Sequence, residues 1–345
     1  MYRSIGAKLL RLCRQLRGGK STSIICLTVS YQSDRWLRPL LESIANHRSD
    51  VFSVEVVLID NSRLPEDVLK DCGQIIPSVR YIKCRENMMY GGGNNVGLAY
   101  INKSCEFSYV LIANPDTKFS TGSLELLVEA AMENPAYGVL AGIQLEYSSG
   151  DANVSSRSQV DLSRLKDSGI VDVRWVEGSA MMITKRCLDS IGGFDPLYKM
   201  YYEDFDLCRR ARKAGFKVGV VPAVRYHHYS NASFKHKAEP ERVKLIDQSQ
   251  FIFQLTDPEY SWETNHLRVV RWLVARTIKW LTGHQPGFGH GLRAIFREYK
   301  SRYRVIRDNW RSRATGDYFA PLPNLNETIE ETYTISSKYS TNEVE

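Results

Sequence analysis

The chain has 345 residues, of which 43% are hydrophobic and 25% are charged, enough to bury one large core with an appendage or two modest domains. Its seven cysteines are scattered and never spaced as Cys-x-x-Cys, which argues against a disulfide framework or a zinc site and favours a reducing cytosol. Basic residues interrupt the most apolar late segment, and no long apolar stretch follows the basic N-terminus, so we expect neither a signal peptide nor a membrane span.

The formal net charge of +7 is unevenly distributed along the chain. Residues 1–20 carry six basic side chains and no acidic one, and residues 268–313 are basic apart from Glu298 and Asp308. This asymmetry predicts an anionic partner surface. In the first segment, four apolar residues would share one side of a helix, as in helices that lie in the headgroup zone of an anionic bilayer: Ile5, Leu9, Cys13 and Leu16.

Between residues 23 and 145, short apolar runs alternate with longer amphipathic stretches, as in a mainly parallel sheet with connecting helices. Four runs have the Ile and Val content of buried strands: Ile24–Ser30, Val54–Asp60, Val79–Lys83 and Tyr109–Ala113. Two helices show an apolar face, made by Leu37, Leu40, Leu41 and Ile44 in the first and by Leu124, Leu127, Val128 and Ala131 in the second. Ser120 or Thr121 is the expected cap of the second helix.

The second half of the chain has a less regular pattern. Residues 147–170 are polar and serine-rich, which is typical of a mobile surface insertion. Three elements are expected after it: a strand at Met181–Thr184, a helix at about Asp204–Ala214 and a strand at Lys217–Val221. Pro222 should end that last strand. After Ser233 the sequence becomes helical and basic, and beyond about Arg313 its composition predicts disorder.

Polar residues follow three of the predicted strands, at the edge where a parallel sheet binds ligands. They are Ser30 and Tyr31 after the first strand, Asp60, Asn61 and Ser62 after the second, and Asn114 and Asp116 after the fourth. A single acid in such a place is more often a helix cap or part of an Asx turn. Three polar groups at one edge favour a ligand site.

A glycine-rich run occupies residues 87–97, between the third and fourth strands. Its glycines would allow close backbone approach, and the N–H groups of the following helix would suit a diphosphate. The residues expected to bind there are Asn87, Gly92, Gly93 and Asn95. The run has Val96 in place of the last glycine of the dinucleotide fingerprint and lacks the Gly-Lys-Ser/Thr of a phosphate loop, so a plain flexible turn is an equal alternative.

The most informative motifs lie between residues 175 and 210. They are Trp-Val-Glu-Gly-Ser-Ala from Trp175, Ile-Gly-Gly-Phe-Asp from Ile191, and Met-Tyr-Tyr-Glu-Asp-Phe-Asp from Met200. Together with Asn-Pro-Asp at Asn114, they resemble the family 2 glycosyltransferases, in particular the rhamnosyltransferase-like branch. The resemblance covers about residues 23–233 and keeps the motifs in the family's order. It implies an α/β fold of the GT-A type, a Rossmann-like core with a mainly parallel sheet, and a C-terminal helical extension.

On the donor side, the resemblance implies that Asp60 accepts a hydrogen bond from the pyrimidine base of a nucleotide-sugar. Ser30 and Tyr31 would line the same pocket, and Asn114 would lie close to the donor. Met89 stands where family members usually have glycine, and Gln32 stands where asparagine is common. Both departures lie in segments that are expected to bind the donor.

The resemblance also implies a metal site. Asp116 would bind a divalent cation, Mg²⁺ or Mn²⁺, that bridges the donor diphosphate, because hard oxygen ligands suit these ions. The alternative is an ordinary turn aspartate. His228 would complete the site from the far side. Adjacent residues of an extended segment face opposite ways, so His227 is the weaker candidate.

The resemblance makes Asp204 the general base, which takes the proton of the acceptor hydroxyl while that oxygen attacks the anomeric carbon. Glu203 would hold the acceptor or share this role. The structural alternative is that Glu203, Asp204 and Asp206 simply open a helix, where the dipole favours acids, with Arg209 and Arg210 available for pairing. Two further residues would shape the sugar pocket: Trp175 and Glu177.

The sequence therefore predicts an inverting, metal-dependent glycosyltransferase, with dTDP-L-rhamnose as the donor that the resemblance suggests. The acceptor would be a hydroxyl of a lipid-linked glycan in the synthesis of a bacterial envelope polysaccharide, O-antigen or capsule. A UDP- or GDP-linked donor of another sugar is an alternative. A catalytically silent glycan- or nucleotide-binding module is an alternative from a different class, but it would have no need for a base.

Four segments are expected: a basic amphipathic segment at 1–20, the catalytic domain at 21–235, a basic helical extension at 236–313 and a disordered acidic tail at 314–345. The extension repeats the basic and apolar pattern of the N-terminus with Trp272, Leu273 and Trp280. Both flanks would hold the protein at the cytoplasmic face of the membrane. The alternatives are helices that cover the catalytic domain or mediate homo-oligomer formation. Nucleic-acid binding is not expected, because no recognition module is present.

Overall fold

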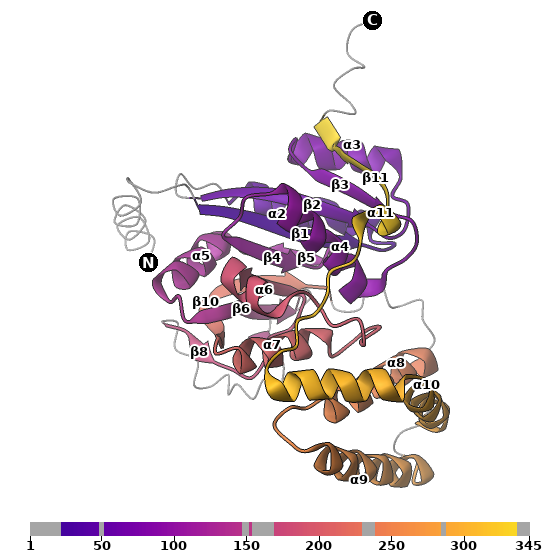
Figure 1. Ribbon diagram of the computed structural model, residues 1–345. Helices are drawn as coiled ribbons and strands as arrows, with labels where there is room; N and C mark the ends of the chain where they lie inside the picture. The colour runs from indigo at the N-terminus through magenta and orange to yellow at the C-terminus, as the bar shows by residue number, and fades with distance from the viewer. Residues whose placement is uncertain are drawn as a thin grey trace, which may run out of the picture.

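The computed structural model describes residues 22–47, 52–146, 152–153, 169–229, 239–283 and 288–336. A large sheet lies between helices, and a layer of C-terminal helices lies beneath it (Figure 1). The segment 1–20 and most of the expected insertion at 147–170 lie outside the described residues, so the expectations for them stay predictions.

The four strands predicted from the first half form one parallel block of the sheet. They are β1 (Thr22–Ser30), β2 (Phe52–Asp60), β3 (Arg80–Cys84) and β4 (Tyr109–Ala113). Their order is β3-β2-β1-β4, and each neighbouring pair is parallel. Ser30 is paired with Asp60 in the register of β1 and β2, so the polar groups expected at one edge do share it.

Helices connect these strands: α2 (Asp34–Ala45), α3 (Glu66–Ile75), α4 (Met89–Ser104) and α5 (Ser123–Glu133). The predicted apolar faces of α2 and α5 are buried. The predicted cap of α5 is wrong, because Gly122, with a φ of 80°, precedes the helix and no side chain caps it. The backbone N–H of Ser120 instead donates to the Arg225 carbonyl, which ties this loop to the sheet.

The rest of the sheet is mixed. It contains β5 (Thr117–Phe119), β6 (Tyr137–Glu146), β7 (Ala152–Asn153), β8 (Val171–Asp172), β9 (Ala180–Thr184) and β10 (Lys217–His228). β9 lies antiparallel between β4 and β6. Pro222 does not end the last of these strands as expected, because a shift in register lies between Val220, opposite Ala141, and Arg225, opposite Ile143. Such a bulge accommodates a residue without an N–H and lets β10 reach His228.

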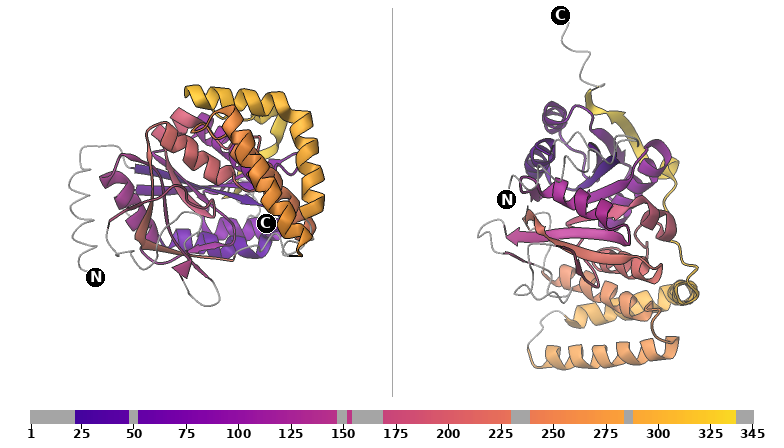
Figure 2. Two further views of the ribbon diagram at one scale, coloured as in Figure 1. Left: turned by 90° about the horizontal axis from the view of Figure 1, so that it is seen from below. Right: turned by 90° about the vertical axis from the view of Figure 1, so that its left-hand side faces the viewer.

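Two helices, α6 (Lys185–Ile191) and α7 (Glu203–Lys213), follow β9 on one face of the sheet. The C-terminal extension forms α8 (Glu239–Leu255), α9 (Trp262–Leu281) and α10 (Phe288–Thr315). An apolar cluster that includes Tyr202, Phe205, Leu255 and Ile306 joins this helical layer to α7. In the side view of Figure 2, α9 is the element farthest from the sheet. None of the described helices is both long and apolar enough to cross a bilayer.

The expectation of disorder beyond Arg313 is wrong as far as Ser336. Ala320 forms a bridge with Gly192, and α11 (Leu325–Thr328) leads into β11 (Ile329–Thr334), which pairs antiparallel with β3. The open edge of β3 supplies hydrogen bonds to this polar strand, and Ile335 is buried at its end. The sequence gives little sign of it, because a strand with few apolar residues relies on a partner far away in the chain.

Candidate active site

Three of the singled-out motifs meet at Gly178 and Ser179, just before β9. The backbone N–H of Asn114 donates to the Ser179 carbonyl over 2.9 Å. The Gly178 N–H donates to Oδ2 of Asp204 over 2.9 Å, and the Tyr90 hydroxyl donates to the Gly178 carbonyl over 2.6 Å. The turn after β4 and the starts of α4 and α7 therefore lie around one short segment.

The two predicted metal ligands lie side by side. Asp116 is in the turn between β4 and β5, and His228 is the last residue of β10, paired with Thr117 of β5. His228 Nε2 is 3.2 Å from Asp116 Oδ1 and 3.3 Å from the Asn114 side-chain nitrogen. His228, rather than His227, thus faces the carboxylate. Among the described residues, no third His, Cys, Asp or Glu joins these two.

Gln144 of β6 orients the His228 ring, and no sequence motif pointed to this residue. Its Oε1 lies 3.2 Å from His228 Nδ1 and 3.3 Å from the Ser179 hydroxyl. Because an amide oxygen only accepts, Nδ1 carries the hydrogen and the lone pair of Nε2 points to Asp116. A lone pair and a carboxylate at 3.2 Å need a proton or a metal ion between them.

Asp204 is a half-buried carboxylate held by two backbone donors, at the start of α7. Gly178 N–H binds Oδ2 and Phe205 N–H binds Oδ1, over 2.9 and 2.8 Å. Burial raises the pKa of Asp204 to about 6, against the opposing effect of the Gly178 N–H and with a further contribution from the Glu177 carboxylate. Above that pH the group is ionised, in a fixed orientation, and basic enough to accept a proton.

Glu203, its neighbour, is buried, and its Oε2 has no hydrogen-bond partner. Burial and the adjacent Asp204 raise the pKa of Glu203 well above its usual range, which favours its neutral form. Tyr201 and Tyr202, which precede α7, both have a φ of 68°, a strained conformation for such residues. This strained turn presents two adjacent carboxyl groups in different surroundings.

Buried polar atoms without partners mark places where a ligand can bind. Besides Glu203 Oε2, they include Nε1 of Trp175 and the hydroxyl of Ser30. The Trp175 ring packs on Phe205, with centroids 5.2 Å apart. Trp175 and the half-buried Glu177 thus lie near the start of α7, and their role in a sugar pocket stays a prediction.

Asp60 has a full set of partners in its own loop. Its Oδ1 accepts from Ser62, and its Oδ2 accepts from the Leu64 N–H and the Tyr81 hydroxyl, each over 2.7 Å. The carboxylate therefore shapes the loop after β2. To bind the pyrimidine of a nucleotide, it would have to give up one of these hydrogen bonds. Tyr31 is half-buried at the same edge. The base-binding role of Asp60, Ser30 and Tyr31 stays a prediction.

The glycine-rich run is the start of α4 rather than a loop, so the alternative of a flexible turn is wrong. A Cβ at Gly93 would lie 2.7 Å from a methyl group of Val29, and one at Gly97 would lie 2.2 Å from Leu27. These glycines let the helix lie closely on β1. Gly92 faces Met88 instead. The first N–H groups of a helix that starts at this edge still suit an anion.

Two asparagines of this run have structural partners. Asn95 donates to the Phe194 carbonyl and accepts from the Phe194 N–H, over 2.8 and 2.7 Å. Its amide therefore positions residues 192–195 and is not available to a nucleotide-sugar. Asn87 Oδ1 accepts from the Met89 N–H over 2.8 Å. Met89 has a φ of 59°, a left-handed conformation that favours glycine. The backbone at this position would therefore accept glycine without strain.

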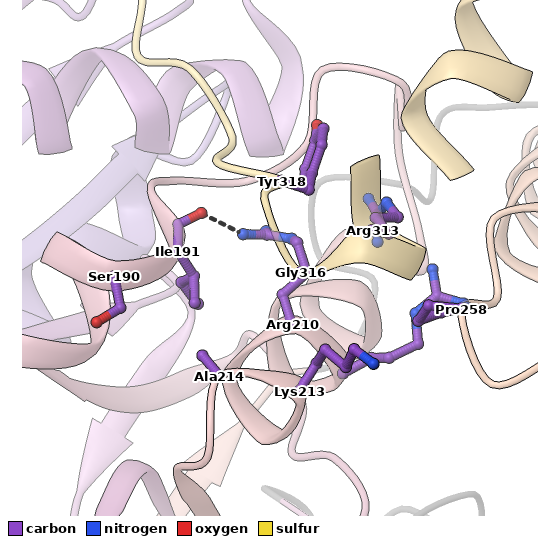
Figure 3. Close-up of a pocket in the computed structure, with 10 residues that line it drawn as sticks. Ser190, Ile191, Arg210, Lys213, Ala214, Pro258, Arg313, Gly316 and Tyr318 are labelled. Atoms are coloured by element: carbon purple, nitrogen blue, oxygen red, sulfur yellow. Dashed lines mark hydrogen bonds between the residues drawn. The ribbon is translucent and has the colours of Figure 1, made fainter. Parts of the chain in front are cut away.

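The opposite side of α7 holds a buried ionic cluster. Asp206 is fully buried and pairs with Arg209, Arg210 and Arg313. Burial alone would raise the pKa of Asp206, but the guanidinium groups of Arg313, Arg209 and Arg210 outweigh it and hold it well below its usual range. The arginines that were the alternative partners of the helix-start acids thus neutralise Asp206. Arg210 also donates to the Ile191 carbonyl, at a small hollow beside Arg313 (Figure 3).

A family model described as "Glycosyltransferase like family 2" matches residues 23–242. The chain belongs to this family. It is therefore a glycosyltransferase, and the match includes every strand from β1 to β10 and the whole site. The enzyme class predicted from the motifs is confirmed.

Curated relatives share about a quarter of their residues with this glycosyltransferase. An N-acetylglucosaminyl-diphospho-decaprenol L-rhamnosyltransferase of Mycobacterium tuberculosis is 26% identical over 62% of this chain and 78% of its own. The low-salt glycan biosynthesis hexosyltransferase Agl10 of Haloferax volcanii is 26% identical over 73% and 83%. The rhamnosyltransferase WbbL of Escherichia coli is 26% identical over 62% and 88%. The resemblance to rhamnosyltransferases is thereby confirmed.

Two solved structures share the fold at low identity. The S. aureus TarS structure superposes with a TM-score of 0.53 at 15% identity, over 85% of this chain and 55% of TarS. GalNAc-T7, solved with UDP, GalNAc and Mn²⁺, superposes with a TM-score of 0.50 at 13% identity, over 78% of this chain and 59% of its own. The predicted GT-A fold is confirmed, with C-terminal helices attached.

Proposed function

We propose that this enzyme transfers a sugar, with inversion, from a nucleoside diphosphate donor to a hydroxyl group of a lipid-linked glycan. The observation that carries the proposal is the state of Asp204. Two backbone N–H groups fix its carboxylate, and burial raises its pKa to about 6. A binding module would gain nothing from a desolvated, oriented carboxylate, whereas a general base needs both properties.

In the proposed reaction, Asp204 removes the proton of the acceptor hydroxyl as that oxygen forms a bond to the anomeric carbon. The bond from this carbon to the donor diphosphate breaks on the opposite side, so the anomeric centre inverts. Glu203, whose Oε2 has no hydrogen-bond partner in the protein, would hold the acceptor by a hydrogen bond. Trp175 would provide an apolar wall and one donor, Nε1, for the sugar.

A divalent cation fits the pair Asp116 and His228. A carboxylate oxygen and an imidazole nitrogen 3.2 Å apart can both bind one Mg²⁺ or Mn²⁺ ion, since two ligands at about 2.1 Å and a right angle are about 3 Å apart. Gln144 holds the His228 ring so that Nε2 lies on the Asp116 side. When bound, the ion would neutralise the charge that develops on the diphosphate as it leaves.

The sugar that the relatives' names favour is rhamnose, because two of the three named relatives are L-rhamnosyl- or rhamnosyltransferases. Together with the sequence motifs, this makes dTDP-L-rhamnose the proposed donor. The name of the M. tuberculosis relative, with its diphospho-decaprenol, supports a lipid-linked acceptor. Such an acceptor would place the enzyme at the inner face of the cell membrane. Another hexose is the second candidate, favoured by the hexosyltransferase Agl10.

Thermal unfolding with dTDP, UDP and GDP, each with and without Mn²⁺, tests the donor and metal parts together. Stabilisation by a bound ligand grows with its concentration over its dissociation constant, so the preferred nucleotide should raise Tm most. Asp116→Ala should remove the extra rise that Mn²⁺ gives. Asp189→Ala, an exposed aspartate on α6, is the control and should keep it. If Asp116→Ala keeps the full metal-dependent rise, the metal role of this residue is wrong.

A further inference from the structure

The outward face of α9 carries a continuous apolar stripe. Five aliphatic side chains along it are more than half exposed: Leu267 (66%), Val270 (54%), Val274 (54%), Ile278 (57%) and Leu281 (71%). Their spacing of three or four residues puts them on one side of the helix. Single exposed aliphatic residues are ordinary, but a stripe that runs along a 20-residue helix indicates an interaction surface.

The other side of α9 is already packed, so the stripe is not the helix's attachment to the protein. Arg276 pairs with Asp247 of α8, and His266 Nε2 is 2.8 Å from the Tyr299 hydroxyl of α10. Trp272 and Leu273 also pack inward, on the apolar cluster that joins the helical layer to α7. The sequence had assigned these two residues to the membrane-facing side, and this assignment is wrong; Trp280 alone of that set is exposed.

The charges on α9 select the partner. After Glu263 in the first turn, the helix contains no acidic residue, and its exposed rim carries Arg271 and Lys279. A second copy packed through this face would bring the cations of both rims close to each other, with Glu263 as the single acidic residue that each α9 offers them. An anionic bilayer offers both hydrocarbon for the stripe and negative headgroups for the rim.

The position of α9 allows it to lie flat on such a surface. It is the outermost element of the helical layer and lies on the side of that layer turned away from the sheet (Figures 1 and 2). Its axis runs along the layer. A helix of 20 residues is about 30 Å long, so all five aliphatic side chains could enter the headgroup region together.

We propose that the outward face of α9 docks the enzyme on a bilayer that contains anionic phospholipids. The stripe inserts at the boundary between headgroups and acyl chains, and Arg271 and Lys279 bind phosphate groups beside it. This docking rests on the proposed function only in its purpose, which is to bring the active site to lipid-linked acceptors. Vesicle binding needs neither donor nor acceptor, so it can fail while the proposed function stands.

Flotation of the full chain with vesicles tests the proposal. At low salt, the protein should float to the top of a density gradient together with vesicles of phosphatidylcholine and phosphatidylglycerol. Val274→Gln/Ile278→Gln should weaken this partitioning about tenfold or more, because two inserted aliphatic side chains are lost. Arg271→Gln/Lys279→Gln should weaken it by a similar factor for anionic vesicles and little for pure phosphatidylcholine.

The matched control removes two apolar side chains of similar fractional exposure elsewhere. Phe296→Gln/Val305→Gln changes two residues of α10 that are 58% and 55% exposed, and it should float as the unmodified protein does. If the control loses as much binding as the α9 variant, or if the α9 variant floats normally, the proposal is overturned. Sedimentation velocity without lipid tests whether a second copy of the chain covers the stripe. A dimer that Val274→Gln/Ile278→Gln converts to monomer would make the stripe a self-association surface and would also overturn the proposal.

Discussion

The two sides of helix α7 shift the pKa of an aspartate in opposite directions. Asp206 is surrounded by three guanidinium groups, which hold its pKa well below the usual range. Asp204, two residues earlier and on the opposite side, has only two backbone N–H groups, and burial raises its pKa to about 6. Neighbouring acids at one helix start thus acquire a structural and a chemical role from their surroundings alone.

This difference has an energetic side. Asp206 and its arginines connect α7 to α10, since Arg313 bonds both Asp206 and Asp195. Asp204 gains no such partner, and its pKa rises from the ordinary value of 3.8 to about 6 in the folded protein. As the pH rises above 3.8, the unfolded chain ionises more readily than the folded one, so this group lowers the free energy of unfolding. The enzyme accepts this loss of stability where a base is needed, as active sites often do.

The largest expected effect is on turnover. Asp204→Asn keeps the shape of the side chain but cannot accept a proton, and loss of a positioned base lowers the rate by about 10² to 10⁴. Donor affinity should barely change, because the base contacts the acceptor hydroxyl, so the loss should appear in kcat. Glu203→Gln, which replaces the carboxyl group by an amide of the same shape, should keep far more activity. The reverse ranking of these two variants in steady-state assays would show that Glu203 is the base.

The next effect concerns stability on the other side of the helix. Asp206→Asn leaves Arg209, Arg210 and Arg313 with one buried carboxylate fewer and should lower the free energy of unfolding by about 3 to 5 kcal/mol. The matched control is Asp189→Asn on α6, whose exposed pair with Lys185 should contribute less than about 1 kcal/mol. Urea unfolding measures both. Equal losses in the two variants would mean that the cluster does not anchor α7.

Much of this arrangement could be predicted from local sequence. The four parallel strands, the polar groups at their ends and the meeting of Asp116 with His228 follow from patterns within short segments and from the order of the motifs. The sequence did not reveal Gln144, the bulge at Pro222 or strand β11, because each depends on a partner far along the chain. Asn95 was misassigned for the same reason: its amide binds Phe194, 99 residues away.

The pH dependence of kcat/KM for the acceptor tests most directly the claim that Asp204 is the base. Its pKa of about 6 predicts a rate that is level above this pH and falls tenfold per pH unit below it, because protonation removes the base. Glu203→Gln should keep a break near pH 6, since burial and the Glu177 carboxylate raise the pKa of Asp204, and Asp204→Asn should lack the break. A profile without any break near pH 6 in the unmodified enzyme, or one that survives in Asp204→Asn, would contradict the assignment.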